Sequence, residues 1–394
     1  MEMKKIHVGT VSYANEAMDE VATYTQQSFS TPVGEEPSYV TPSSTYTAPL
    51  TSATRTRREI GLRVRDVVLA LALCHNVTPI TEEEDGQMVT SYQASSPDEI
   101  AIIRWTEMVG LKLLQRDRES MTLQSCDSGN NVVRVRILNV FPFTSESKRM
   151  GIVVQFYSGP VSSPLEEGGE IWFYQKGADT VMTSIVAAND WLDEETANMA
   201  REGLRTLVVG RKKLSTERYQ EFSSKHAQAS LVLHNRDSAV AEVVKDFLEH
   251  DLELLGVTGV EDKLQKDVKP SLELLRNAGI KIWMLTGDKV ETARCVAVSS
   301  KLVARGQYVH TIAKSEFMGS ALIACYVTNA NNHSETQRPC TLFSGLSPWQ
   351  NRCMPPHRRR VSCSHADALP PRVHLHRSAA SCCRSLPVFP DAKG

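Results

Sequence analysis

Two charged loops follow two short apolar runs in the second half of the chain. The loop Glu261-Asp262-Lys263 follows the run from Leu252 to Val260, and Thr286-Gly287-Asp288 follows the run from Ile280 to Leu285. Carboxylate oxygens are ligands that suit Mg²⁺, and a glycine turn that leads into a helix suits phosphate. We therefore expect both loops to take part in chemistry that uses Mg²⁺ and phosphate.

The elements around these loops are expected to bring them to one edge of a sheet. A segment with helical periodicity separates the two apolar runs, and we expect Asp267 to be its N-cap and Gly279 to end it. The order strand, helix, strand, loop, helix is typical of parallel strands with right-handed crossovers. In such sheets ligands bind outside the carboxyl ends of the strands.

A helix start and a glycine turn place further charged residues near predicted strand or helix ends. Ser96-Pro97-Asp98-Glu99 favours a helix with Ser96 as N-cap and with Glu99 closing a capping box. After a predicted strand at 171–175, Gly177 would let the backbone approach a ligand, Lys176 would supply positive charge, and Asp179 would cap the next helix. The alternative is an ordinary turn beside a surface lysine.

An aromatic residue and a lysine lie between two further predicted strands. The segment from Val132 to Val140 alternates like a strand, and a second strand is expected from Gly151 to Tyr157. In the loop between them, Phe143 could stack on adenine while Lys148 offsets phosphate charge. A core phenylalanine and a solvated lysine are the alternative.

Two more charged or titratable residues lie near the ends of predicted elements. Arg205 precedes a predicted strand and offers a guanidinium fork to phosphate, to an internal carboxylate or to a helix end. His75 follows a helical segment from Glu59 to Cys74, where the helix dipole favours a histidine at the C-terminal end.

Composition limits the class of protein. A chain of 394 residues suggests roughly two to three domains. Its formal charge of −2 gives no electrostatic reason to expect nucleic acid as a partner. No run approaches the roughly 20 apolar residues that a membrane helix needs, and no signal peptide is visible. Nine cysteines, an odd number, indicate reduced cytosolic thiols, and a disordered tail is favoured over a zinc site for the cysteines and histidines near the C-terminus.

Several of these segments together resemble one family. The runs VEDKLQ and WMLTGDKVETA resemble the phosphorylation domain of type IV P-type ATPases, the phospholipid-transporting flippases. The runs CHNVTP, SSPDE, FPFTSESKRM, YQKGADTVM and GLRTL resemble the nucleotide-binding domain of the same family. The resemblance runs continuously to about residue 304 and covers roughly three quarters of the chain.

The resemblance implies ATP as ligand, with Mg²⁺ expected for the family although its ligands are largely missing here. Glu99 would line the adenosine pocket, Phe143 would stack on adenine, and Asp262 would support the phosphorylation domain. The residues implied to bind the nucleotide are Glu99, Phe143, Ser145, Lys148, Lys176, Arg205, Thr206, Thr286, Gly287 and Asp288.

The fold class implied is α/β and α+β. An antiparallel-sheet nucleotide-binding domain with flanking helices at 59–250 would be inserted into an incomplete, haloacid-dehalogenase-like parallel-sheet domain at 251–314, with 1–25 as a remnant of that domain or a linker. Residues 26–58, rich in Ser, Thr and Pro, are expected to be a disordered loop, and 315–394 a disordered tail. Because strands of the parallel sheet would be missing, we expect 252–304 to be only marginally stable.

The family couples ATP hydrolysis to phospholipid transport between membrane leaflets. The phosphorylated Asp-Lys-Thr-Gly-Thr motif, the later Mg²⁺-binding loop and the membrane helices are absent from this sequence. We therefore expect a cytosolic chain that binds nucleotide but does not pump, whereas full-length relatives would be multi-pass proteins of Golgi, endosomal or plasma membranes. The alternative is a non-catalytic interaction protein that competes with the intact flippase for a partner subunit.

Overall fold

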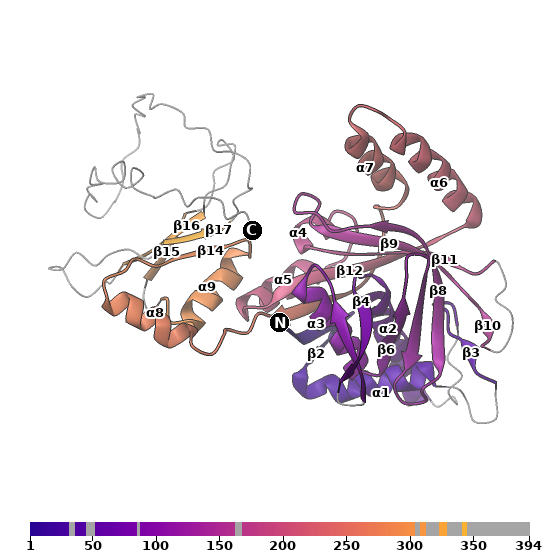
Figure 1. The fold of residues 1–394 in the computed structure, drawn as a ribbon, viewed down its shortest axis with the longest axis horizontal. Helices are drawn as coiled ribbons and strands as arrows, with labels where there is room; N and C mark the ends of the chain where they lie inside the picture. The colour runs from indigo at the N-terminus through magenta and orange to yellow at the C-terminus, as the bar shows by residue number, and fades with distance from the viewer. Residues whose placement is uncertain are drawn as a thin grey trace. The chain divides into compact units, whose positions relative to one another are not determined.

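The computed structural model describes residues 1–30, 36–44, 52–84, 87–161, 168–303, 308–312, 323–328 and 341–344. All of these lie in one compact unit that extends from Met1 to Leu346. Figure 1 shows the path of the chain through this unit.

A nine-stranded sheet forms the centre of the larger part of the unit, in the order β2-β1-β13-β12-β11-β9-β8-β7-β6. Every neighbouring pair in it is antiparallel. The strands are β1 (Glu2–Val8), β2 (Val11–Ala14), β6 (Leu111–Arg116), β7 (Ser120–Ser125), β8 (Asn131–Phe141), β9 (Arg149–Phe156), β11 (Ile171–Gly177), β12 (Arg205–Leu214) and β13 (Glu253–Glu261). The predicted antiparallel sheet is confirmed.

Helices cover both faces of this sheet, which explains why its central strands are apolar on both sides. On β11, Trp172 and Tyr174 belong to one buried cluster and Phe173 to the other, as the two-residue period of a strand requires. The first cluster includes residues of α1 (Met18–Phe29), α2 (Ser52–Leu73) and α3 (Pro97–Met108). The second includes residues of α4 (Asp179–Met182), α5 (Leu192–Arg201), α6 (Thr216–Ser230) and α7 (Arg236–Phe247).

Short elements complete this part of the chain. The hairpin of β4 (Thr78–Glu84) and β5 (Gln87–Gln93) forms a separate two-stranded sheet, and β3 (Ser38–Tyr39) pairs with β10 (Gly159–Pro160) in another. A 3₁₀ helix, η1 (Asn15–Ala17), leads into α1.

The second apolar run belongs to a different sheet from the first. Four strands pair in the order β14-β17-β16-β15, with β14 (Trp283–Thr286) parallel to β17 (Thr341–Ser344) and the other two pairs antiparallel. The remaining strands are β15 (Tyr308–Ile312) and β16 (Ile323–Thr328). Between β13 and β15, the helices are α8 (Val268–Asn277) and α9 (Val290–Ser299). Gly279, with φ of +75°, follows α8 as predicted.

The expected parallel pairing of the two apolar runs is wrong. β13 pairs antiparallel with β1 and β12, so the run from Leu252 to Val260 completes the nucleotide-domain sheet instead of starting a parallel one. A short apolar run fits either kind of sheet, and its partner β1 lies about 250 residues earlier in the chain, a separation that no local pattern reveals. Two segments outside the predicted nucleotide domain at 59–250, β1 before it and β13 after it, therefore contribute to its sheet.

The expected disorder of 26–58 and 315–394 stays a prediction, although the structure describes ordered segments within both ranges. Phe29 and Tyr39 are buried, and Arg65 donates hydrogen bonds to the carbonyl oxygens of Pro42 and Ser44 at 2.8 and 2.7 Å. These contacts give a segment poor in aliphatic residues a fixed path that composition does not reveal. In the C-terminal stretch, β16 and β17 are regular strands. Within these two ranges, residues 31–35, 45–51, 315–322, 329–340 and 345–394 lie outside the described residues.

Candidate nucleotide site

A buried ion pair joins the start of α3 to the end of β11. Lys176 Nζ lies 3.0 Å from Glu99 Oε1, and the side chains are only 5% and 11% exposed. The other carboxylate oxygen of Glu99 accepts a hydrogen bond from the backbone N–H of Asn76 at 3.3 Å. Lys176 is buried because every residue of β11 is buried within the sheet.

The predicted capping box at α3 is wrong, although the helix start is correct. Ser96 is extended and Pro97 opens the helix, but the Ser96 side chain makes no capping hydrogen bond. Glu99 turns to Lys176 instead, because a buried ammonium needs a charged partner more than an exposed backbone N–H does.

The loop between β8 and β9 lies directly beside the Lys176-Gly177 turn. The Ala178 N–H donates to the Lys148 carbonyl oxygen at 2.9 Å. A β-carbon on Gly177 would lie 2.7 Å from Arg149 Cβ and 2.9 Å from the Lys148 carbonyl oxygen. The glycine therefore permits close approach, as predicted, but the group that approaches is the chain's own loop.

The side chains of this loop face solvent. Phe143 is 59% exposed, which excludes the core interpretation of this residue. Ser145 and Lys148 are also exposed. Lys148 has a φ of 51°, and its N–H donates to the Thr144 carbonyl oxygen at 2.9 Å, so a tight turn sets the backbone from which its side chain extends.

Arg205, at the start of β12, lies among three carboxylates. Its Nε is 3.0 Å from Asp288 Oδ1, and its two terminal nitrogens are 3.2 Å from Asp262 Oδ2 and 3.5 Å from Asp98 Oδ2. Of the three partners considered for Arg205, the structure shows internal carboxylates. The adjacent Thr206 lies in the sheet opposite Gly259.

The charge of this cluster affects Asp98. Burial raises the pKa of Asp98, the Arg205 guanidinium counteracts part of that shift, and the carboxylates of Asp262 and Asp288 add to it. Three acidic groups around one guanidinium leave an excess of negative charge, so proton uptake at Asp98 becomes easier.

The Thr286-Gly287-Asp288 loop is held by its own hydrogen bonds and by an ion pair to α4. Thr286 Oγ1 donates to Asp288 Oδ2 at 2.9 Å and accepts from the Asp288 N–H at 3.1 Å. Lys289 forms an ion pair with Asp179. The side chain of Asp179 does not cap α4, so that prediction is wrong. Gly287 has no atom within 4 Å of the position of an added β-carbon.

His75 follows α2 but is not a charged residue at a helix end. It is fully buried, its Nδ1 accepts from the Val77 N–H at 3.0 Å, and its Nε2 therefore donates to the Ala72 carbonyl oxygen at 2.9 Å. Burial lowers the pKa of His75 well below its usual value, and the positive charges of Arg116 and Lys176 add to this shift. The imidazole satisfies a helix carbonyl as a neutral donor.

The predicted site residues thus form two groups. In the first, Glu99 pairs with Lys176, and the loop that carries Phe143, Ser145 and Lys148 is hydrogen-bonded through its backbone to the turn after Lys176. In the second, Arg205 contacts Asp262 and Asp288, and Asp288 belongs to the Thr286 loop. Asp98, next to Glu99, contacts Arg205 and links the groups. The predicted set omits Asp98, Asp179 and Lys289. The one sequence signal for them is their position beside predicted residues in the SPDE, KGAD and TGDK runs.

The described residues do not fit a resident Mg²⁺ site. Across these residues there is no cluster of three His, Cys, Asp or Glu side chains that could hold a metal ion. Each of the three aspartates around Arg205 forms an ion pair with its guanidinium, which offsets part of their charge.

Comparison with known proteins shows what this chain is similar to. The family model of the P-type ATPase cytoplasmic domain N matches residues 63–267. Phospholipid-transporting ATPase NEO1 of Saccharomyces cerevisiae is 55% identical over 314 residues, which cover 80% of this chain and 25% of NEO1. Probable phospholipid-transporting ATPase IIB of Homo sapiens is 47% identical over 336 residues, covering 82% of this chain and 28% of the relative.

The chain therefore spans only about a quarter of the length of these curated relatives. In the part that the structure describes, no helix combines the length and the apolar character that crossing a bilayer requires. The match of the domain N model to residues 63–267, more than half of the sequence, shows that this chain belongs to the P-type ATPases, and most of it is similar to the phospholipid-transporting members of that family.

Proposed function

We propose that this chain binds ATP at the turn after β11, as the nucleotide-binding part of a phospholipid-transporting P-type ATPase. The observation that carries the proposal is the exposed Phe143 on a loop that is hydrogen-bonded to the Lys176-Gly177-Ala178 turn. A solvent-exposed aromatic ring on an ordered turn beside a lysine gives adenine a stacking surface and gives phosphate a nearby positive charge.

The charges assign different roles to the three basic residues. Lys176 is neutralised by Glu99, so this pair contributes position and hydrogen bonding more than net charge. Lys148 is exposed and has no ion-pair partner among the described residues, so it offers the available positive charge. Arg205 would exchange its carboxylate partners for phosphate oxygens, which fit the same guanidinium fork.

Lipid transport would belong to the whole protein. The named relatives are phospholipid-transporting ATPases, and this chain matches a quarter of their length, so transport is proposed only for a protein that also contains the remaining parts. Mg²⁺ would be needed with ATP for phosphoryl transfer, and the described residues do not supply its ligands. Competition with an intact flippase for a partner subunit stays a prediction, since no contact among the described residues identifies a partner surface.

Isothermal titration of the full chain with ATP tests the proposal. We expect saturable binding that weakens about tenfold in Phe143→Ala, the loss expected from removing one stacked aromatic ring. The control is Leu233→Ala, which removes another exposed apolar side chain, 94% exposed, far along the sequence. No binding by a chain shown to be folded, or equal affinities for the two variants, would contradict the proposal.

A further inference from the structure

A cavity lined mainly by cationic side chains contains none of the predicted nucleotide-binding residues. Three of its lining residues, Arg201, Val290 and Glu291, also line a neighbouring pocket that includes Asp288. The cationic cavity has a volume of about 1010 Å³ and lies along α9, between the end of α5 and α8. Its charged lining residues are Arg201, Lys269, Arg276, Arg294, Lys301 and Glu291. Five cations and one carboxylate line this space in a chain whose formal net charge is −2, so the positive charge is concentrated here.

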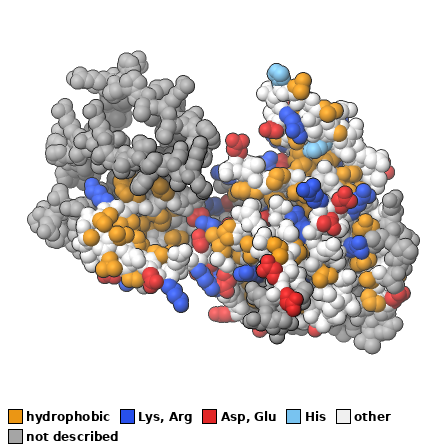
Figure 2. All heavy atoms as spheres, in the orientation of Figure 1, with side chains coloured by type: hydrophobic (Ala, Val, Ile, Leu, Met, Phe, Trp, Pro, Cys, Tyr) orange, Lys and Arg blue, Asp and Glu red, His pale blue; other side chains and the backbone are white. Residues whose placement is uncertain are grey.

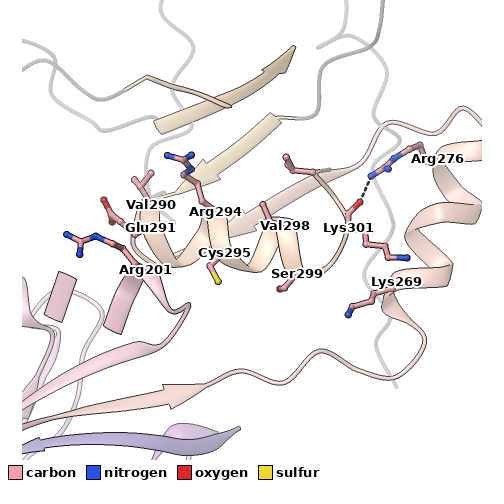
Figure 3. A pocket seen from close by; sticks show the side chains of 11 residues that line it. Arg201, Lys269, Arg276, Val290, Glu291, Arg294, Cys295, Val298, Ser299 and Lys301 are labelled. Carbon is pink, nitrogen blue, oxygen red and sulfur yellow. Dashed lines mark hydrogen bonds between the residues drawn. The ribbon is translucent and has the colours of Figure 1, made fainter. Parts of the chain in front are cut away.

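The cationic side chains are arranged around α9. Figure 3 shows Arg201 near the start of this helix, with Lys269 and Lys301 near its other end. The opposite face of α9 is packed, because Thr292, Ala293 and Ala297 are buried. A helix of ten residues is about 15 Å long, so the charges extend over more than the width of one phosphate group.

Two of the five cations already have local partners. Arg276 donates to the carbonyl oxygens of Lys301 and Leu302 at 2.7 and 2.8 Å, which holds the end of α9. Arg201 donates to Asn198 Oδ1 at 2.6 Å. These bonds fix the positions of the two guanidinium groups and leave their positive charge uncompensated.

The other three cations have no such partner. No carboxylate of the described residues lies within ion-pair distance of Lys269, Arg294 or Lys301, although their neighbour Glu291 lines the same cavity. Like charges brought together without counter-charge repel each other, and a multivalent anion relieves that repulsion. We propose that this cavity binds an extended anion that carries several phosphate groups.

The source of the phosphates is either a free polyphosphate or the headgroups of a phospholipid surface. Both present phosphate oxygens to the same cations. The probes are therefore sodium tripolyphosphate in solution, and phosphatidylcholine vesicles with and without phosphatidic acid. Each is tested on the full chain.

The test variant is Lys269→Gln with Arg294→Gln, which removes two cations that hold no structural bond among the described residues. Its matched control is Lys245→Gln with Arg236→Gln, the same two exchanges at exposed positions of α7. We expect the cavity variant to bind the probe at least about tenfold more weakly, the loss expected when hydrogen bonds to a charged ligand are removed. The control should bind like the unchanged chain.

Each outcome separates the possibilities. Loss of tripolyphosphate binding in the cavity variant supports a free polyphosphate, and loss of binding to vesicles with phosphatidic acid supports a headgroup. Equal weakening in both variants means non-specific attraction and overturns the proposal, as does absence of binding in both arms. Arg205→Gln, a change in the nucleotide site, should retain the probe binding that the cavity variant loses. This result would distinguish the cavity from the nucleotide site.

A chemical readout checks the location without a variant. Cys295 lines the cavity, whereas Cys126 is exposed elsewhere. Tripolyphosphate should slow alkylation of Cys295 by iodoacetamide and leave the rate at Cys126 unchanged, both measured by peptide mass spectrometry in one sample. Unchanged alkylation of Cys295 at a saturating probe concentration would place the anion elsewhere.

Discussion

Glu99 and Lys176 form an ion pair that the fold removes from water: their charged atoms are 3.0 Å apart and both side chains are almost fully buried. Taking two charges out of water costs free energy, which their attraction offsets only while both are present. Loss of one partner leaves an isolated buried charge.

We therefore expect Glu99→Gln or Lys176→Met to lower the free energy of unfolding by about 3–5 kcal/mol. The double variant Glu99→Gln with Lys176→Met should recover a large part of this loss, because no charge is then left without a partner. Urea unfolding measures all three. The comparison pair is Glu221 and Lys225, which are half exposed on α6; removing either should change stability by less than about 0.5 kcal/mol. Additive losses in the double variant would show that the two side chains do not act as a pair.

The buried neutral His75 should make stability depend on pH. Its folded pKa lies below the unfolded value, so the unfolded state binds more protons as the pH falls. This contribution is complete above about pH 6.5 and is lost as the pH falls toward the folded pKa, at up to about 1.4 kcal/mol per pH unit. Urea unfolding between pH 7.5 and 5 measures the slope. His75→Gln should be less stable at pH 7.5 and should show a flatter slope.

His226 supplies the comparison for this prediction. Burial also lowers its pKa, with a smaller contribution from Arg236, but His226 is only partly buried. His226→Gln should retain most of the pH slope. If the slope were instead lost in that variant and kept in His75→Gln, the assignment to His75 would be wrong.

The sequence predicts those parts of the fold whose signals are local. Alternation predicts β8, and the strand expected at 151–157 corresponds to β9. The helical period predicts α2, which begins earlier than expected, at Ser52. The local pattern leaves a core position open for Phe143, and only the family resemblance favours a side chain that faces a ligand. Local pattern and resemblance together therefore identify the residues around the turn after β11.

What the sequence does not predict depends on distant partners. Glu99 and Asp179 each have a plausible capping role in their own helix, yet they pair with Lys176 and Lys289, 77 and 110 residues away. Each carboxylate can either cap an exposed backbone N–H or pair with a lysine that the fold shields from water. The ion pair forms because an unpaired, shielded ammonium group costs more free energy than an uncapped N–H that water can reach. The same applies to β13, whose partner β1 lies near the N-terminal end of the sequence.

Two glycines of the predicted site should respond differently to substitution. Gly177→Ala places a methyl group 2.7 to 3.0 Å from backbone and Cβ atoms of Lys148 and Arg149, which cannot move independently of the sheet. We expect a loss of about 1–3 kcal/mol in unfolding free energy and weaker ATP binding. Gly287→Ala meets no neighbouring atom and should change stability by less than about 0.5 kcal/mol. Thermal unfolding and titration with ATP measure both variants. Equal losses at the two positions would contradict the contact described for Gly177.

Arg205 should hold the Thr286 loop in place. Its guanidinium contacts Asp288 directly, and without it the carboxylates of Asp98, Asp262 and Asp288 repel one another. In Arg205→Gln we expect amide hydrogen exchange of residues 286–290 to rise by about tenfold, which corresponds to about 1.4 kcal/mol. Arg201→Gln, four residues earlier, is the control, because Arg201 bonds to Asn198 and forms no ion pair with these aspartates among the described residues. Exchange that is unchanged in Arg205→Gln would mean that the ion pair of Lys289 with Asp179 holds the loop by itself.

Because β13 pairs antiparallel with β1 and β12, we expect protection from hydrogen exchange to drop after residue 261 and not at residue 252. If 251–304 formed one unit, protection from hydrogen exchange would fall from residue 252 onward. Because β13 has ladder partners on both sides, we expect residues 253–261 to exchange as slowly as β11 and β12.

Residues 268–303 should exchange much faster than this sheet. The buried apolar cluster there consists of Ala297, Leu302 and Val303, and Leu274 and Leu285 are 70% and 72% exposed. Figure 2 shows hydrophobic side chains gathered on the surface of this part of the molecule. Little buried apolar area means low local stability, so protection should drop after Glu261 and not before it. Hydrogen exchange followed by peptide mass spectrometry resolves this boundary. A drop that begins at residue 252 would contradict the pairing of β13 with β1 and β12.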